Sequence, residues 1–458
     1  MSPTPTGRRQ RERLEEILRS GHGLRRWLDT VAESTDREEQ VDGLAPEQAV
    51  ALGRLLDDRS AEDLLSSIEP ESAAGLLRRL EPADAARLLA TVNTDLAAHI
   101  LRALPREVRD SVLSAVPEVR SDVLRRLVAR SSDTAAGHLV PEVLTVRADA
   151  TVEQAIEVAR GFGAQGADSQ TGAYLYVLDA DGVLAGVVAF RALVLSPPGV
   201  LVSALMTSDP LRARQGARAE AAARLLLDHR LLALPVVDDD GRLAGILTAD
   251  AAADIVEDEA MDDAERQGAS RPLDVPYLKA SPWLLWRKRI VWLLVLFVAE
   301  AYTGTVLQVF EHELEAVVSL AFFIPLLIGT GGNTGTQVTT TLVRAVSTGQ
   351  VRLKDIGRVV AKETATAGMI AVAMAGAGLV RAFTLNVGWQ VVLVVSLTLA
   401  AIVLWSGLVA SVLPLLLTKS RVDPAVVSGP MIATIVDGTG LIIYFLIAKA
   451  LLPELAGL

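Results

Sequence analysis

The fold of this chain is decided at residues 426–445, which read VVSGPMIATIVDGTGLIIYF. The stretch is long enough to cross a membrane, and Asp437 is its only charged side chain. A carboxylate in hydrocarbon is costly, so Asp437 should face a protein interior or a water-filled path. Gly429, Gly438 and Gly440 lie around it and let helices approach closely. We interpret the stretch as the acidic lining of a cation path that the rest of the chain gates.

Charge divides the chain into two halves. Of its 55 Asp/Glu and 44 Lys/Arg residues, 9 and 12 lie in residues 281–458, which leaves 46 and 32 in residues 1–280, a net charge of −14. An acidic balance disfavours nucleic acid as a partner and suits divalent cations. The absence of cysteine excludes disulfides, thiolate metal sites and cysteine catalysis. No apolar signal-peptide segment opens the chain, so the acidic half is expected to be cytoplasmic.

Residues 44–136 are predicted to form an α-solenoid, after a charged N-terminal arm at residues 1–43 that we expect to be a solvated helix or tail. Residues 62–130 repeat with a period of 12, and two apolar sets fall in register: Leu76, Leu88, Ile100, Val112 and Leu124, and Leu80, Val92, Leu104, Val116 and Val128. Helix-start signals recur at the same spacing: Glu69-Pro70, Glu81-Pro82, Asn93-Thr94, Pro105 and Pro117. Each unit is therefore a short helix that is buried by stacking on its neighbours.

Residues 137–256 contain a second repeat, with an offset of 59. The stretch 177–186 (VLDADGVLAG) matches 236–245 (VVDDDGRLAG), and each copy is a strand, an Asp/Gly turn and a second strand. A helical pattern precedes each hairpin, at residues 152–160 and 219–228. The arrangement resembles a tandem pair of CBS modules, the α+β units that dimerise and sense ligands.

Residues 257–286 are predicted to be an acidic connecting helix and linker. The segment opens with Glu257, Asp258, Glu259, Asp262 and Asp263, which continue the preceding helix. It then passes three prolines and reaches Trp283 and Trp286, a residue type that favours the membrane interface.

Residues 287–458 are predicted to hold five membrane-spanning helices, at about 290–310, 316–343, 359–380, 389–418 and 426–451. Basic residues cluster at 287–289, between 344 and 358, and at 419–421. By the positive-inside rule these segments are cytoplasmic, so the C-terminus is expected outside. The fold class is thus a multi-domain membrane protein with a helical solenoid, a CBS pair, a connecting helix and a five-span domain.

Three carboxylates lie well inside the predicted spans: Glu300, Glu363 and Asp437. Mg²⁺ prefers oxygen ligands and releases its waters reluctantly, so its pore needs few carboxylates and room for a hydrated ion. Asp437 has no base in the interior of its own span, since no other charged side chain lies between Ala425 and Ala448, which favours a functional role over an ion pair. For Glu363, an ion pair with Lys362 or Arg358 and a functional role remain equally open, and Glu300 is undecided.

Glycines crowd the second span at residues 329–337, GTGGNTGTQ. A phosphate loop is disfavoured, because no lysine closes the stretch and no strand precedes it. We predict a broken helix, with Pro325 promoting the break and exposed carbonyls lining a cavity. Close helix packing through small residues is the alternative. If the helix continues, Asn333 and Gln337 lie one turn apart on one face.

Catalytic patterns are weak in this sequence. His312 lies between two glutamates, but the second histidine of a zinc-protease motif is replaced by Ala316. The other histidines all lie in the acidic half, and no nucleophile elbow is present. The sequence therefore predicts no enzyme.

The order of these parts resembles the MgtE family of magnesium channels, from about residue 44 to 451. The most specific matches are residues 327–337 and the 422–440 segment that carries Asp423-Pro424, Gly429-Pro430, Thr434, Asp437 and Gly440. The resemblance implies a homodimer in the cell membrane with a pore along its axis. It also implies that Asp437 holds hydrated Mg²⁺, with Asn333 nearby and Asp423 at the cytoplasmic mouth.

The same resemblance implies a magnesium sensor in the cytoplasmic half. Ions bridging like-charged acidic surfaces would draw the domains together and close the pore. Positions that match sensor ligands are Asp250, Asp254, Glu259, Asp262, Asp263 and Glu107. Others depart from the family: Ala251, Ser111 and Arg87 replace expected acids, and Arg230 stands where an acid is usual. Arginine at a cation site adds repulsion, so we predict weaker magnesium gating than is usual in the family.

Two further readings stay open at this point. Thr248 and Asp250 resemble the ribose-phosphate position of CBS modules, so ATP is a candidate ligand. The spans could instead serve a coupled secondary transporter or anchor a CBS-based regulator. No paired repeat of spans supports the transporter, and an anchor leaves Asp437 unexplained. Mn²⁺, Co²⁺ and Ca²⁺ also take oxygen ligands, so the pattern alone does not select Mg²⁺.

Overall fold

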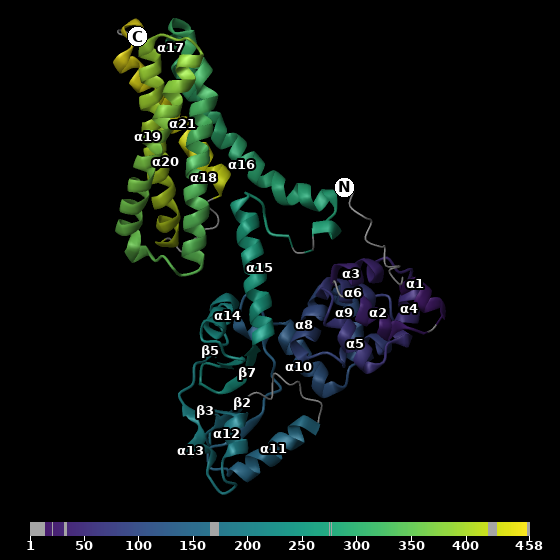
Figure 1. Cartoon of the computed structure of the whole chain (residues 1–458). Helices are drawn as coiled ribbons and strands as arrows, with labels where there is room; N and C mark the ends of the chain where they lie inside the picture. The colour runs from purple at the N-terminus through teal and green to yellow at the C-terminus, as the bar shows by residue number, and fades with distance from the viewer. Residues whose placement is uncertain are drawn as a thin grey trace, which may run out of the picture. The chain divides into compact units, whose positions relative to one another are not determined.

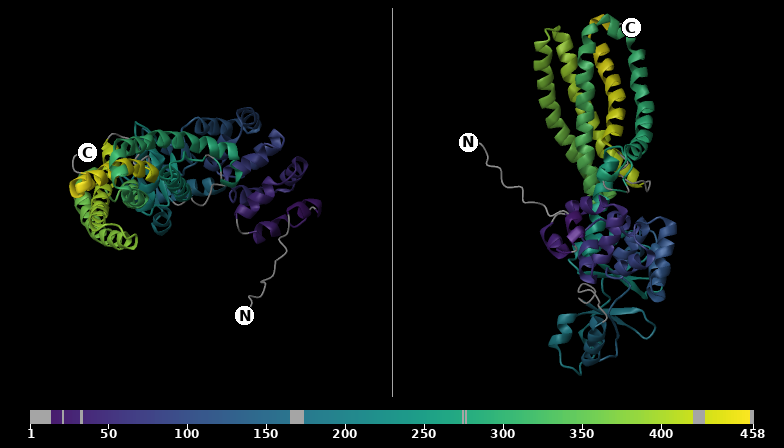
Figure 2. Two further views of the ribbon diagram at one scale, coloured as in Figure 1. Left: turned by 90° about the horizontal axis from the view of Figure 1, so that it is seen from above. Right: turned by 90° about the vertical axis from the view of Figure 1, so that its right-hand side faces the viewer.

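The structure, a computed structural model, describes residues 14–20, 22–31, 34–164, 174–273, 275, 277–419 and 428–455. It divides into two compact units, Met1–Glu257 and Asp258–Leu458, whose elements are labelled in Figure 1 and seen from two further sides in Figure 2. Helices and hairpins make up the first unit, and long apolar helices make up most of the second.

The helical repeat follows the 12-residue period closely. Six helices begin at residues 58, 70, 82, 94, 106 and 118: α5 Asp58–Leu65, α6 Pro70–Leu77, α7 Pro82–Leu89, α8 Thr94–Ala103, α9 Arg106–Ala115 and α10 Glu118–Val128. Proline occupies the first turn of α6 and α7, and the Asn93 side chain caps α8 by accepting from the Leu96 amide at 2.8 Å. All five residues of the set that starts at Leu76 are at most 1% exposed. Each helix from α5 to α8 packs on the next but one, so the units bury one another.

The described part of the N-terminal arm is helical and partly buried, where the sequence indicated a solvated helix or tail. It contributes α1 Leu14–Ser20, α2 Leu24–Thr30 and α3 Ser34–Asp42, which precede α4 Pro46–Leu55. Trp27 is fully buried, and its indole donates to Gln40 Oε1 at 3.1 Å. This part of the arm therefore belongs to the core of the helical domain, because its apolar side chains, such as Leu14, Trp27 and Val41, are buried in that core.

Arginine side chains donate hydrogen bonds to carbonyls at the ends of neighbouring repeat helices. Arg87 donates to the carbonyls of Gly53 and Leu56 at 2.6 and 3.1 Å, and Arg120 donates to those of Leu89 and Val92 at 3.1 and 2.7 Å. The last carbonyls of a helix have no partner within it, so a guanidinium from a neighbour satisfies them. Arg87, where an acid was expected, thus has a structural role.

Two βαββ modules follow, at the predicted offset. The first holds β1 Thr145–Arg147, α11 Val152–Ala164, β2 Tyr174–Leu178, β3 Leu184–Ala189, α12 Phe190–Leu195, α13 Val202–Leu205 and β4 Thr207–Ser208. The second holds β5 Ala213–Arg214, α14 Ala219–Asp228, β6 Ala233–Val237 and β7 Leu243–Thr248. In each, the first strand pairs parallel to the second and the hairpin is antiparallel. Gly182 and Gly241 take φ near +80° in the hairpin turns, a conformation that glycine adopts without strain. The predicted α+β pair is confirmed.

The acidic run lies on one continuous helix, α15 Ala249–Gln267, which begins directly after β7. No glycine or proline interrupts the sequence before Gly268, so nothing ends the helix at residue 257. Its first turns are buried at Ala251, Ala252 and Ile255. A short 3-10 turn, η2 Tyr277–Lys279, leads to the apolar helices, where Trp283 and Trp286 stack with ring centroids 4.5 Å apart.

Five helical segments of the described chain are long and apolar enough to cross a membrane, as predicted. Their helices are α16 Pro282–Val309, α18 Ile324–Ser347, α19 Ile356–Thr384, α20 Trp389–Lys419 and α21 Gly429–Leu451. Shorter pieces join them: α17 Glu311–Ala316, η3 Val318–Phe323 and η4 Leu353–Asp355, with η6 Pro453–Leu455 at the end. Helices α18, α20 and α21 pack against one another, α19 lies on α20, and α16 lies on α21 (Figure 1; Figure 2).

The predicted break in the second span is wrong. Helix α18 runs unbroken through residues 329–337, and Pro325 sits in its first turn, where its missing N–H costs nothing. The change of geometry comes earlier, where η3 gives way to α18 at Ile324. The glycines serve close packing, which was the alternative interpretation.

Candidate cation site in the membrane unit

The crossing of α18 and α21 depends on glycine. A Cβ at Gly331 would lie 2.7 Å from Val436 Cγ1 and 2.8 Å from Ile402 Cγ2, and a Cβ at Gly335 would lie 2.8 Å from Ser406 Oγ. Neighbouring carbons normally keep a greater separation, so α18 reaches α20 and α21 only because these positions have no side chain. The Ser406 hydroxyl donates to the Gly331 carbonyl at 2.7 Å and secures the contact.

A cavity of about 390 Å³ opens where α18 and α21 meet. It is lined by Ile328, Gly329, Gly332, Asn333, Thr336, Gly429, Pro430, Ala433 and Asp437. Asn333 is exposed, and Gly332 leaves room beside the carboxylate, since its Cβ would lie 3.8 Å from Asp437 Oδ1. Two of the residues singled out from the sequence are thus brought to one cavity by two helices that lie about 100 residues apart in the chain.

The Asp437 carboxylate has no basic neighbour among the residues that the structure describes. Its Oδ1 is buried and accepts no hydrogen bond there. The charge of Glu300, on α16, acts on Asp437 and is of the same sign. Gly438 packs against the ring of Tyr302, which holds α21 against α16. The ion-pair alternative for Asp437 therefore finds no support in the described part of the chain.

The other two membrane carboxylates differ in position. Glu300 is close enough for its charge to reach Asp437, whereas Glu363 on α19 does not line the cavity. No ion pair joins Glu363 to Lys362 or Arg358 in the described part of the chain. Asp423 lies outside the described residues.

The acids of α15 are partly engaged. Arg266 lies 3.2 Å from Asp262 and 3.9 Å from Asp263, so these two predicted ligands share a base of their own helix. Withdrawal from water, then the charges of Asp250 and Glu257, raise the pKa of Asp254. Glu107 is exposed in the first turn of α9.

The predicted nucleotide residues lie at the junction of β7 and α15. Thr248 ends the strand and is 4% exposed, and Asp250 is in the first turn of the helix and exposed. A carboxylate at a helix N-terminus is stabilised by the helix dipole. The two residues are therefore adjacent, but only one of them is accessible.

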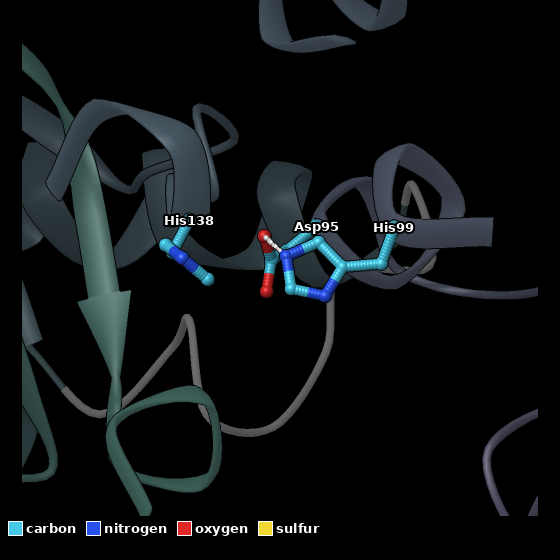
Figure 3. A group of neighbouring side chains, drawn as sticks. All are labelled: Asp95, His99 and His138. Atoms are coloured by element: carbon cyan, nitrogen blue, oxygen red, sulfur yellow. Dashed lines mark ion pairs between the residues drawn. The ribbon is translucent and has the colours of Figure 1, made fainter. Parts of the chain in front are cut away.

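The structure also assembles a group that the sequence analysis missed. Asp95 and His99 lie one turn apart on α8, and His138 ends the 3-10 turn η1 Ala135–His138. Their potential ligand atoms all lie within 4.8 Å of one another, and Figure 3 shows the Asp95 carboxylate between the two imidazole rings. The spacing of Asp95 and His99 could have suggested a shared face, whereas nothing in the sequence places His138 beside them.

Burial dominates the electrostatics of this group. It raises the pKa of Asp95 to about 6, against the effects of His138 and Arg102. It lowers the pKa of His99 to about 4, with Arg102 adding to the effect, and it also lowers the pKa of His138. Both imidazoles are thus neutral at pH 7, and each keeps one nitrogen lone pair.

Three family descriptions match the chain. Residues 324–447 match MgtE, described as a divalent cation transporter, residues 32–131 match the MgtE intracellular N domain, and residues 202–258 match the CBS domain. None of these is a family of enzymes.

Curated relatives match over most of the chain. The protein named magnesium transporter MgtE of Thermus thermophilus is 39% identical over 346 residues, 73% of this chain and 74% of its own length. The protein of the same name from Bacillus subtilis is 31% identical over 347 residues, 75% of each chain. Among solved structures, the cytosolic domain of the Mg²⁺ channel MgtE in complex with ATP is 30% identical and covers 54% of this chain and 99% of its own, with a TM-score of 0.48.

The sequence comparison covers both units and includes the helices that form the cavity around Asp437. The chain belongs to the MgtE family of magnesium transporters, as a multi-pass membrane protein with a helical N domain and a CBS pair.

Proposed function

We propose that this chain is a Mg²⁺ channel whose ion is held by Asp437. The observation that carries the proposal is a carboxylate on a membrane helix that faces an open cavity and has no base beside it in the described part of the chain. A buried charge without a protein partner is destabilising, and such a residue marks an ion path more often than a structural contact. The relatives' names, magnesium transporter, agree with Mg²⁺ as the ion.

The size of the cavity suits a hydrated ion. Six waters of about 30 Å³ each occupy about 180 Å³, which fits within the cavity of about 390 Å³. Asp437 would bind through the water shell, and the Asn333 amide oxygen offers a second acceptor for those waters. Asp423 is proposed at the cytoplasmic mouth by the resemblance alone.

A second copy of the chain is proposed to complete the path. Among the described residues the cavity lining comes from α18 and α21, so one chain supplies one wall and leaves Asn333 exposed. An ion crossing hydrocarbon needs polar groups all round, so a homodimer would place two such walls face to face. The C-terminus is proposed to lie outside, with the positive-inside rule for the basic segments as the support.

The homodimer can be tested by cross-linking, since the chain has no cysteine of its own. A single cysteine at Asn333 should be joined to the same cysteine of the second copy by a bifunctional thiol reagent in the membrane, because a path that holds a hydrated ion is too wide for a direct disulfide. The matched control is a cysteine at Val372, which is 76% exposed on α19 and should not cross-link. Equal cross-linking at both positions, or none at Asn333, contradicts the proposed arrangement.

Magnesium sensing by the cytoplasmic half is proposed to be weak. Support comes from three positions where an acid was expected. Ala251 is buried in the core, Arg87 is bound to carbonyls of α4, and Arg230 is exposed with φ of 52°. The acids at 250, 254, 259, 262, 263 and 107 remain as the proposed ligand set, with Arg266 competing for two of them.

ATP is a candidate ligand of the CBS pair. The observation in favour is that Thr248 and Asp250 lie two residues apart at a strand-to-helix junction. A ribose hydroxyl could donate a hydrogen bond to the Asp250 carboxylate there. Calorimetric titration of the full-length protein should show heat of binding that Asp250→Ala abolishes. Absence of heat at millimolar ATP removes this ligand.

Transport is tested by Mg²⁺ uptake in cells that lack their own Mg²⁺ importers. Wild type and Glu363→Gln should restore uptake, because Glu363 does not line the cavity. Asp437→Ala should lose it. Uptake by Asp437→Ala at the wild-type rate would favour the anchored-regulator alternative.

A further inference from the structure

A cluster in the cytoplasmic unit has the geometry of a metal site. Asp95 Oδ1 and His99 Nε2 are 3.6 Å apart, and the His99 and His138 rings meet edge to face with centroids 4.8 Å apart. In a tetrahedral site, two ligand atoms that each lie about 2.1 Å from the metal ion are about 3.4 Å apart. The first pair is therefore already at ligand spacing, and small side-chain rotations would bring the third ligand into range.

One ring nitrogen of His138, Nε2, already has a hydrogen-bond partner. His138 Nε2 lies 2.7 Å from the Ser132 carbonyl, which can only accept, so Nε2 carries the proton and Nδ1 keeps its lone pair. Metal-bound histidines typically donate their other N–H to a backbone carbonyl in this way, which fixes the ring and its tautomer. The Ser132 carbonyl is held by a tight loop, since Gly137 has no room for a Cβ against the Ser131 carbonyl.

The atoms that face one another lack hydrogen bonds. Asp95 is only 8% exposed, and its Oδ1 and His99 Nε2 are both buried without a hydrogen-bond partner in the described structure. At 3.6 Å they are too far apart to bond each other well. Buried polar atoms are nearly always satisfied, so unsatisfied ones that converge on one point indicate a missing ligand.

We propose that Asp95, His99 and His138 bind one divalent transition metal ion of the Zn²⁺, Co²⁺ or Ni²⁺ kind. Two neutral imidazoles and one carboxylate suit such borderline ions, whereas Mg²⁺ favours an all-oxygen shell. The site lies in the cytoplasmic unit and is independent of the transport path through Asp437. Water completes the coordination shell.

Nearby charges are compatible with a dication. The positive Arg102 acts on Asp95, but its Nη2 is anchored by the Leu127 and Gly137 carbonyls at 2.8 Å each. The negative charges of Asp250 and Asp254 also act on Asp95 and offset Arg102. Metal coordination would offset the unfavourable desolvation of the Asp95 carboxylate, whose buried Oδ1 lacks a hydrogen bond.

The site would join parts of the cytoplasmic unit. Asp95 and His99 belong to the helical repeat, η1 packs on α14 of the second CBS module, and Asp250 and Asp254 lie on α15. A bound ion would therefore fix the helical domain to the module from which the connecting helix departs. Transition metal supply would then bear on the same domains as the proposed magnesium sensing.

The first test measures retained metal. Full-length protein in detergent, with its purification tag removed, is loaded with Zn²⁺ and dialysed against metal-free buffer with millimolar Mg²⁺. Wild type should keep about one Zn²⁺ per chain that His99→Gln and His138→Gln lose, and its thermal midpoint should rise with Zn²⁺. The control His229→Gln, an exposed histidine on the same unit, should keep it. Equal Zn²⁺ in wild type and both site variants, or none in wild type, overturns the proposal.

A second measurement needs no variant and so does not depend on variant folding. X-ray absorption of wild type loaded with Co²⁺ should show scattering from two imidazole rings in a shell of mixed nitrogen and oxygen. A shell of oxygen alone overturns the proposal.

Discussion

Among the residues that the structure describes, two carboxylates, those of Asp95 and Asp437, each have a buried oxygen that accepts no hydrogen bond. Asp437 faces a cavity in the membrane unit, and Asp95 faces two histidines in the cytoplasmic unit. The sequence predicted the first, because one charge in an apolar stretch is conspicuous. It did not predict the second, because a single acid in a charged helical domain is ordinary, and His138 comes from a distant turn.

Replacing Asp95 by a neutral residue should make the effect of the two histidines on the pH dependence of stability measurable. The pKa of Asp95 is raised to about 6, so its contribution to stability is complete below about pH 4 and is lost as pH rises through 6. The pKa of His99 is lowered to about 4, so its contribution is complete above pH 6.5 and is lost as pH falls through 4. The two nearly cancel in wild type.

In Asp95→Asn only the histidine effect remains. We expect the thermal midpoint of this variant, measured in chelator, to rise between pH 4.5 and 6.5, with a gain in the free energy of unfolding of at most about 3 kcal/mol from each histidine. Wild type should change less over this range. A midpoint that falls with pH in Asp95→Asn contradicts the assigned directions.

At the scale of elements, local sequence patterns predicted the repeat helices and the hairpins correctly, but they misjudged the glycine-rich part of α18. The 12-residue period located five helices, α6 to α10, because each start carries a proline or a cap, and the 59-residue offset located two hairpins because each turn needs glycine. The glycine run of α18 was misread as a break. Glycine weakens a helix locally, but Gly331 and Gly335 permit contacts with Val436 and Ser406 that only the tertiary structure shows.

The glycine contact between α18, α20 and α21 makes a specific prediction. Gly331→Val should force Val436 and Ile402 apart and cost about 1–3 kcal/mol, which lowers the thermal midpoint in detergent. Gly329→Ala on the same helix has open space within 4 Å and should melt like wild type or slightly higher. Equal destabilisation by both changes would indicate that helix propensity, not packing, governs this crossing.

At the scale of the whole molecule, composition separated the two units. The acidic half and the apolar half were visible from residue counts, and the order of the parts indicated the family before any coordinates. Residue counts could not predict the cavity, because Asn333 and Asp437 come to line it only when α18 crosses α21. Sequence thus predicted the residues of this site, and packing brings them together.

Magnesium should protect the linker only at high concentration. Protease cleavage in residues 268–281 is the measurement, since ions that draw the acidic domains together would shield this segment. We expect protection to need millimolar Mg²⁺, and Asp254→Asn to raise that concentration further. Full protection of wild type at submillimolar Mg²⁺ would show that Ala251, Arg87 and Arg230 do not weaken sensing.

The most direct measurement of the central claim is Mg²⁺ flux into proteoliposomes that contain purified protein. Asp437→Asn keeps the size of the side chain and removes its charge, and Glu363→Gln makes the same change on a helix that does not line the cavity. Flux should fall at least about tenfold in Asp437→Asn, a change of about 1.4 kcal/mol or more, and stay at the wild-type level in Glu363→Gln. Wild-type flux in Asp437→Asn would contradict the account.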